Sequence, residues 1–171
     1  MFNGIIFNIG IVNKIKKSNK GVNIFIKSNL KVKKKDLGVS ICCDGVCLTM
    51  VSLRNRIMEF YLLKETMNRS KFKNISIGDR INLELPLKYG QKISGHLCQG
   101  HVDCTSKVIG IINKGKSRIY DFTIDKKNLS YLIPKASILL NGVSLTISKV
   151  TKKGFQVCLL YTSPSPRDAE S

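Results

Sequence analysis

A six-residue pattern occurs twice in the chain, and this duplication limits the possible folds more than any other feature. Residues 44–49 read Asp-Gly-Val-Cys-Leu-Thr and residues 141–146 read Asn-Gly-Val-Ser-Leu-Thr, with the two glycines 97 positions apart. Residues 1–6 and 97–102 form a second related pair at almost the same offset. A period of this size is too long for a solenoid repeat and fits a small domain. The sequence therefore predicts two homologous domains in tandem.

Short β-branched and apolar segments separated by turn residues fill both halves of the chain. Asp44-Gly45 and Asn141-Gly142 are typical turns of β-hairpins. The strands expected in the first half are 5–12, 22–27, 39–43, 47–51, 57–63 and 81–85, with a short helix at 66–72. In the second half they are 101–112, 118–124, 138–140, 144–150 and a segment from 154, with a short helix at 128–133. This spacing predicts an all-β fold of two six-stranded barrels, of which the second stops after about four strands.

The end of the chain departs from the repeat. We place the first domain at 1–88 and the second at 89–157, and we expect 158–171 to be a non-native tail. Lys64-Glu65-Thr66 should recur near 161–163, where the chain instead has Tyr-Thr-Ser followed by two prolines. Residues 158–168 resemble the translation of a transposase sequencing adapter, which predicts a second barrel truncated at its C-terminus. The alternative is a genuine disordered tail, since proline, serine and charge suit disorder, although 157–160 could also continue a strand.

The net charge of +18 raises the possibility of a nucleic-acid-binding protein. Only six of the 29 basic residues are arginine, and the lysines are spread along a chain that is also rich in Asn and Ile. No aromatic residues alternate with them to form a stacking platform for single strands. We therefore interpret the charge as a solvated surface and expect no nucleic-acid partner.

The cysteine pattern and the N-terminal residues indicate the cellular compartment of the protein. The six cysteines include no CxxC pair, and no basic segment precedes the apolar stretch at the N-terminus. No apolar run approaches the length of a membrane span. These features predict a cytoplasmic protein with reduced thiols and no membrane partner.

Five motifs in order give the chain a specific resemblance. Together they resemble the riboflavin synthase family of the alpha chain type, over residues 1 to about 157, and they are residues 1–6, 44–49, 64–66, 94–102 and 141–146. The resemblance implies two Greek-key barrels per chain, a homotrimer, and no metal or organic cofactor. It also implies a dismutation in which two molecules of 6,7-dimethyl-8-ribityllumazine exchange a four-carbon unit and yield riboflavin and 5-amino-6-ribitylamino-uracil. Because the chain is expected to lack part of its second pocket, we expect it to be inactive by itself.

The resemblance also implies catalytic roles. Cys47 and Ser144 hold equivalent positions, and one of them delivers or positions the nucleophile at ring carbon 7. His101 is expected to carry the proton of the methyl group on carbon 7. Thr146 and Lys135 complete the expected catalytic set. Each also has a purely structural interpretation: a small buried thiol, a strand threonine, or one lysine among many.

Substrate binding is expected in two pockets. The resemblance assigns to them the residues Gly4, Ile5, Ile6, Cys47, Leu48, Thr49, Tyr61, Leu62, Leu63, Lys64, Glu65, Thr66, Gly100, His101, Val102, Lys135, Ser144, Leu145 and Thr146. Glu65 and Thr66 are expected to bind the ribityl hydroxyl groups. Asn141 stands where many relatives have Asp, so a carboxylate role at that position is not predicted.

Two alternatives remain open. A lumazine- or flavin-binding relative without catalysis would keep the same fold, and a basic nucleic-acid-binding protein is a remote third possibility. His96, Cys98, His101 and Cys104 have the residue types of a metal site, but we expect no metal, because they fall on a predicted loop and strand start.

We predict that the genomic copy of this reading frame diverges from the printed chain after residue 157. The repeat requires further strand sequence there, with a counterpart of Lys64-Glu65-Thr66. Sequencing a genomic contig across this codon tests the prediction. A contig that carries 158–168 unchanged would contradict it.

Overall fold

The computed structural model describes residues 1–160 and divides the chain into two compact units. The first unit contains Met1–Cys104 and Leu139–Val143, and the second contains Thr105–Ile138 and, among the described residues, 144–160. Within residues 1–160 no helix has the length and apolar character needed to cross a membrane. The predicted domain bounds at residues 88 and 157 stay a prediction.

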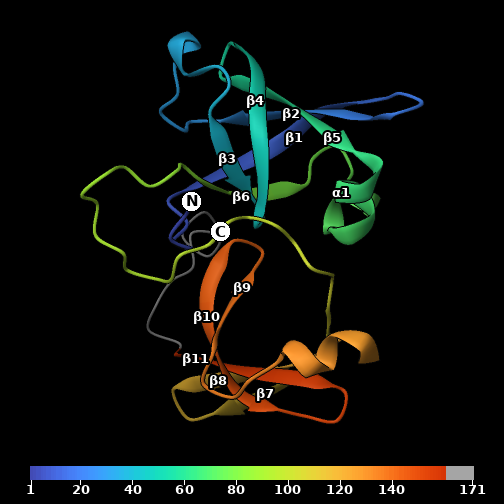
Figure 1. Cartoon of the computed structure of the whole chain (residues 1–171), viewed down its shortest axis with the longest axis vertical. Helices are drawn as coiled ribbons and strands as arrows, with labels where there is room; N and C mark the ends of the chain where they lie inside the picture. Colours follow the sequence, from blue (N-terminus) through green and yellow to red (C-terminus); the bar gives the residue numbers. More distant parts are fainter. Residues whose placement is uncertain (161–171) are drawn as a thin grey trace. The chain divides into compact units, whose positions relative to one another are not determined.

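The first unit is built on a closed barrel with the strand order β1-β2-β5-β4-β3-β6 (Figure 1). All neighbouring strands that pair are antiparallel, and β6 closes the ring by pairing with both β1 and β3. The strands are β1 (Asn8–Lys17), β2 (Gly21–Ser28), β3 (Ser40–Cys43), β4 (Val46–Arg54), β5 (Ile57–Leu63) and β6 (Arg80–Glu84). Three short helices, η1 (Lys34–Asp36), α1 (Lys64–Arg69) and η2 (Lys71–Asn74), connect them. The predicted six-stranded first barrel is therefore confirmed.

Side chains along each barrel strand alternate between the barrel core and the outer face. On β5, Met58, Phe60 and Leu62 are buried, whereas Tyr61 and Leu63 are exposed. This is the period of two that a strand imposes on its side chains. The same alternation on the other strands fills the barrel with aliphatic and aromatic side chains, and Phe72 of η2 joins them.

The second unit contains an open five-stranded sheet with the order β7-β8-β11-β10-β9. Its strands are β7 (Lys107–Lys114), β8 (Ser117–Thr123), β9 (Ser137–Leu140), β10 (Val143–Val150) and β11 (Gly154–Leu160), with η3 (Lys126–Tyr131) after β8. Phe122 and Phe155 stack with their ring centroids 5.0 Å apart. Within the described residues no strand joins β7 to β9, so the predicted incompleteness of the second barrel is confirmed.

Some predicted bounds were wrong. Five strands form in the second unit rather than about four, because β11 continues through Leu160, and residues 158–160 pair with Ser117–Ile119 of β8. The strands expected from residues 5 and 101 begin only at Asn8 and Lys107. In both places a glycine with positive φ, Gly4 or Gly100, comes just before the expected start, and residues 5–7 and 101–106 are not part of any strand. The origin of 158–168 stays a prediction, and 161–171 lie outside the described residues.

Residues of the first unit meet their own repeat equivalents at two places. Phe2 and Cys98 form an isolated antiparallel bridge, with N–O distances of 2.8 and 2.9 Å. At the second place, a Cβ built on Gly45 would lie 3.0 Å from the backbone nitrogen of Gly142, and one built on Gly142 would lie 3.1 Å from that of Gly45. Both pairs have offsets of 96–97, so the duplicated segments pack against each other. The tight turns that open the repeated motif are thereby fixed in place.

Substituting Gly45 by alanine should lower the free energy of unfolding by about 1–3 kcal/mol more than the same change at Gly78. Both glycines have positive φ, 87° and 93°, so the backbone strain is matched. A Cβ at Gly78 meets nothing within 4 Å, whereas one at Gly45 strikes the Gly142 backbone. Urea denaturation of both variants measures the difference. Equal losses would show that the contact between the turns contributes nothing.

Candidate active site

The repeated motif places Cys47 outside the barrel core. On β3 and β4 the side chains of Ile41, Cys43, Val46 and Leu48 belong to the core cluster. Cys42 and Cys47 alternate with them and face outward, where they pack with Phe2, Cys98 and Leu139. The Cys47 thiol is therefore half-buried at the outer surface of the barrel, beneath the N-terminal residues and the segment that contains Cys98.

The backbone of Gly100 lies directly against Cys47. The Cys47 N–H donates to the Gly100 carbonyl at 2.8 Å. A Cβ at Gly100 would lie 2.7 Å from the Cys47 Cβ, and Gly100 has a φ of 80°. Only glycine satisfies both conditions without strain. Two predicted site segments, 47–49 and 100–102, are thus brought together.

The predicted substrate-binding residues of β4 and β5 lie where these two strands separate. The pairing between β4 and β5 runs from Arg54 opposite Ile57 to Met50 opposite Phe60. Beyond Met50, β4 stays paired with β3 through Thr49, and beyond Phe60, β5 stays paired with β2 through Leu63. Thr49 shares the outer face of β4 with Cys47, and both Tyr61 and Leu63 face outward on β5. Between these strand ends, the backbone groups of Thr49 and Tyr61 are not paired in the β4–β5 ladder.

Other predicted residues of the first pocket serve the core. Leu48 and Leu62 are buried in the barrel, and Val102 packs against the same cluster. Their side chains therefore point into the barrel core, so only their backbone groups are available at the outer face. Gly4 and Ile6 are buried and Ile5 is half-buried.

The start of α1 carries the predicted ribityl-binding residues. Lys64 and Glu65 are exposed and Thr66 is half-buried. The Glu65 carboxylate forms an ion pair with Arg69 at 2.9 Å. Because both partners of this ion pair are exposed, the Glu65 carboxylate is accessible from solvent.

The predicted residues of the second pocket lie in the second unit. Ser144 and Leu145 are half-buried on β10, and Thr146 is exposed. Lys135 is exposed, has a φ of 69°, and its N–H donates to the Ile147 carbonyl at 2.8 Å. The assignment of all these residues to a substrate site stays a prediction.

The two histidines occupy different surroundings. His101 is exposed, directly after Gly100. His96 is half-buried, and this burial lowers its pKa below the usual 6.5. Among residues 1–160, no group of three or more His, Cys, Asp and Glu side chains is arranged to hold a metal ion. The expected absence of a metal stays a prediction.

Asp44 anchors the turn before Cys47, a role that the sequence did not reveal. Its side chain is fully buried, and its Oδ2 lies 2.6 Å from Lys71 Nζ. Its Oδ1 accepts the Asn82 N–H at 2.9 Å, and the Asn82 side chain donates to the Asn141 carbonyl at 2.8 Å. The turns at 44–45 and 141–142 are therefore tied to the same residue of β6.

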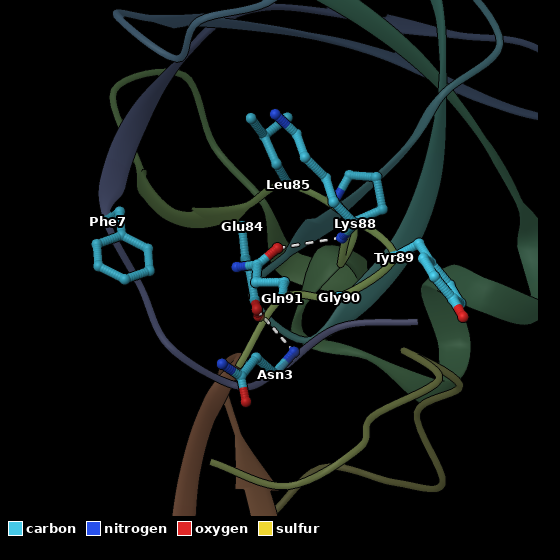
Figure 2. A pocket seen from close by; sticks show the side chains of 9 residues that line it. Asn3, Phe7, Glu84, Leu85, Lys88, Tyr89, Gly90 and Gln91 are labelled. Atoms are coloured by element: carbon cyan, nitrogen blue, oxygen red, sulfur yellow. Dashed lines mark hydrogen bonds between the residues drawn. The ribbon is translucent and has the colours of Figure 1, made fainter. Parts of the chain in front are cut away.

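Glu84 holds the N-terminal segment in a similar way (Figure 2). Its carboxylate accepts the backbone N–H of Asn3 at 2.7 Å and that of Gly4 at 3.0 Å. Burial raises the pKa of Glu84 above 4.5, although these backbone donors act in the opposite direction. Glu84 also lines an open pocket of ≈ 510 Å³, together with Asn3, Phe7, Leu85, Pro86, Lys88, Tyr89, Gly90 and Gln91. None of the predicted site residues lines this pocket.

The sequence is similar to characterised proteins over most of its length. A family model of the lumazine binding domain matches residues 3–86 and 99–165. The riboflavin synthase of Brucella abortus (strain 2308) is 33% identical over 168 residues, covering 95% of this chain and 83% of the relative. That of Chlamydia pneumoniae is 35% identical over 161 residues, covering 94% and 78%. That of Bacillus subtilis (strain 168) is 30% identical over 160 residues, covering 94% and 74%.

Solved structures share the fold. LumP complexed with riboflavin superposes with a TM-score of 0.79 at 22% identity, covering 94% of this chain and 87% of that chain. LumP complexed with 6,7-dimethyl-8-(1'-D-ribityl) lumazine gives a TM-score of 0.77 at 21% identity, covering 94% and 86%.

The raised pKa of Glu84 predicts a pH dependence of stability. A carboxyl group whose pKa is higher in the folded state binds its proton more tightly there, so protonation favours folding. The free energy of unfolding should therefore fall as pH rises from about 4.5 through the folded-state pKa. Glu84→Gln should remove this component, whereas Glu65→Gln, at an exposed position, should keep it. Urea denaturation at a series of pH values from about 4 to 8 measures the slope of the free energy of unfolding against pH. Identical slopes for Glu84→Gln and the unmodified chain would contradict the assignment.

Proposed function

The chain belongs to the lumazine-binding domain family, and we propose that it catalyses the riboflavin synthase reaction. Two molecules of 6,7-dimethyl-8-ribityllumazine are the substrates. One donates a four-carbon unit to the other, which becomes riboflavin, and the donor leaves as 5-amino-6-ribitylamino-uracil. The similarity to curated riboflavin synthases over 94–95% of the chain supports this proposal.

The observation that carries the proposal is the duplicated motif with a nucleophile in each copy. Cys47 is the second residue of β4 and Ser144 is the second residue of β10, and each strand follows a turn with positive φ at both central residues. A dismutation consumes two copies of one substrate and therefore needs two similar pockets. Holding both reactants in place converts an encounter of two molecules into a step within one complex, which removes much of the entropic barrier.

The first pocket lies over the separated ends of β4 and β5. Backbone groups near Thr49 and Leu62 meet the pyrimidine edge of the ring system, and Cys47 lies beside carbon 7. Glu65 and Thr66, at the start of α1, bind the ribityl hydroxyl groups. The buried side chains of Leu48 and Leu62 keep this surface rigid.

Proton transfer falls to His101. The hydrogen bond from the Cys47 N–H to the carbonyl of Gly100, the residue before His101, supports this role. An imidazole nitrogen can act as a general base and accept a proton from the acidic methyl group on carbon 7. Lys135, Ser144, Leu145 and Thr146 form the corresponding second pocket. The active assembly is a cytoplasmic homotrimer with no nucleic-acid or membrane partner, in which first and second pockets of neighbouring subunits face each other.

The activity test uses protein expressed from its genomic reading frame. This protein is mixed with 6,7-dimethyl-8-ribityllumazine, and riboflavin is followed by absorbance and chromatography. Riboflavin and 5-amino-6-ribitylamino-uracil should form in equal amounts. Tight binding of the lumazine without riboflavin formation would support a non-catalytic binding protein instead. If the protein shows no binding and no turnover, both functions are rejected.

Cys47→Ser should lower kcat on the order of tenfold or more, because a serine hydroxyl is a much poorer nucleophile than a thiol at neutral pH. Ser144→Cys should have a smaller effect, because it adds a thiol to the site rather than removing one. Steady-state kinetics of both variants measure the asymmetry. Cys43→Ser, at a buried position facing the core, controls for the loss of a thiol elsewhere in the motif. Equal rates for Cys47→Ser and the unmodified protein would rule out a nucleophilic role for Cys47.

A further inference from the structure

Cys42 and Cys47 occupy opposite positions on the β3–β4 hairpin. The strand register pairs Cys42 with Cys47 and Cys43 with Val46, and the two-residue turn Asp44-Gly45 closes the hairpin. Residues directly opposite each other in an antiparallel pair project to the same face of the sheet. Both side chains accordingly belong to the outer cluster with Phe2 and Cys98, while Cys43 belongs to the barrel core.

The backbone geometry suits a bond between the two thiols. The Cys47 N–H donates to the Gly100 carbonyl rather than to β3, and Cys42 pairs on its other side with Glu84 of β6. This is the pattern of a non-hydrogen-bonded pair, in which the Cα atoms lie about 4.5 Å apart. That separation falls within the range of about 4.4–6.8 Å found across disulfides.

We propose that Cys42 and Cys47 form a reversible disulfide that switches off the site. Hydrogen peroxide is the oxidant class. The Cys47 thiol gives up its proton, the thiolate attacks one peroxide oxygen and the O–O bond breaks, and the released hydroxide takes up that proton, so that a sulfenic acid and water result. The Cys42 sulfur then attacks the sulfenic sulfur, the S–O bond breaks, and the hydroxide leaves with the Cys42 proton as a second water. Two thiols and one peroxide thus give one disulfide and two waters.

The surroundings of the two sulfurs assign these roles. Cys47 is half-buried and is the more accessible thiol, so it meets the oxidant first. Cys42 is only 1% exposed, and burial, reinforced by Glu84, raises its pKa to about 12. It is therefore protected from direct oxidation and acts as the resolving partner held beside Cys47. Disulfides between directly opposed strand residues are often strained, and strained disulfides are readily reduced, as a switch in a reducing compartment requires.

The disulfide itself follows from the hairpin geometry, and its inhibitory effect rests on the proposed function of Cys47. Oxidation removes the nucleophile from the first pocket. The second nucleophile, Ser144, is insensitive to peroxide. Residue 139, the repeat equivalent of Cys42, is a leucine. The second copy of the motif therefore cannot form the equivalent disulfide.

Mass spectrometry tests the disulfide without reference to activity. The whole protein is treated with hydrogen peroxide, alkylated under denaturing conditions and cleaved before aspartate. Cleavage before Asp36, Asp44 and Asp79 separates Cys42 and Cys43 from Cys47, so a disulfide appears as peptide 36–43 linked to peptide 44–78. The link should be lost in Cys42→Ala and in the nearly isosteric Cys42→Ser, and kept in Cys43→Ala and Cys98→Ala. A link that survives in both Cys42 variants, a Cys47–Cys98 link, or oxidation of Cys47 without any link would overturn the proposal.

The activity assay is run on the same samples. Peroxide should lower riboflavin formation by about tenfold or more in the unmodified protein, with recovery after dithiothreitol, because a disulfide retains no nucleophilic thiolate. Cys42→Ser should keep its reduced-state activity but should not recover, because Cys47 then oxidises further. A disulfide that forms without loss of activity would overturn the switch while leaving the enzyme function intact. Absence of turnover in the reduced protein would reject the proposed function but not the disulfide.

Discussion

Coverage of the outer face of β3, β4 and β6 by duplicated segments is the interaction on which the first unit depends. Strand alternation points Cys42, Cys47, Asn82 and Glu84 away from the barrel core, yet all four are buried or half-buried. Phe2, Gly4, Cys98, Gly100 and the turn at 141–142 cover them, through backbone hydrogen bonds and glycine contacts that tolerate no larger side chain. Buried polar groups on this face are satisfied by backbone donors and acceptors, as low-dielectric surroundings require.

This arrangement explains why the candidate site lies where it does. The covered face fixes the turn at 44–45 from three sides, through Lys71, Asn82 and the turn at 141–142. Cys47, the second residue after this turn, is therefore held at the margin of the cover, next to the separated ends of β4 and β5. A reacting group on a rigid support can be positioned accurately without losing conformational entropy in each turnover. The same hairpin holds Cys42 opposite Cys47, so the proposed reactivity and the proposed oxidation both depend on one hairpin.

The sequence predicted the first barrel and both motif hairpins because their signals are local. Alternation in 57–63 and the Asp-Gly and Asn-Gly turns depend only on neighbouring residues. It did not predict the clamps formed by Asp44 and Glu84, since a carboxylate in a turn or on the outer face of a strand ordinarily meets solvent. Here the donors include backbone N–H groups of residues some 40 to 80 positions away, which no residue type in the sequence indicates. The late starts of β1 and β7 have the same origin, because the glycines upstream of them are held by distant partners.

The most direct test of this account is whether ligand covers Cys47. The protein is alkylated with iodoacetamide in the absence and presence of saturating 6,7-dimethyl-8-ribityllumazine, and the modification of each cysteine is timed by mass spectrometry. Half-buried Cys104, which is not among the predicted site residues, is the internal reference. The account predicts that the lumazine slows alkylation of Cys47 by about tenfold or more, because a bound planar ring excludes the reagent, while Cys104 reacts at an unchanged rate. Equal rates of Cys47 alkylation with and without bound lumazine would contradict it.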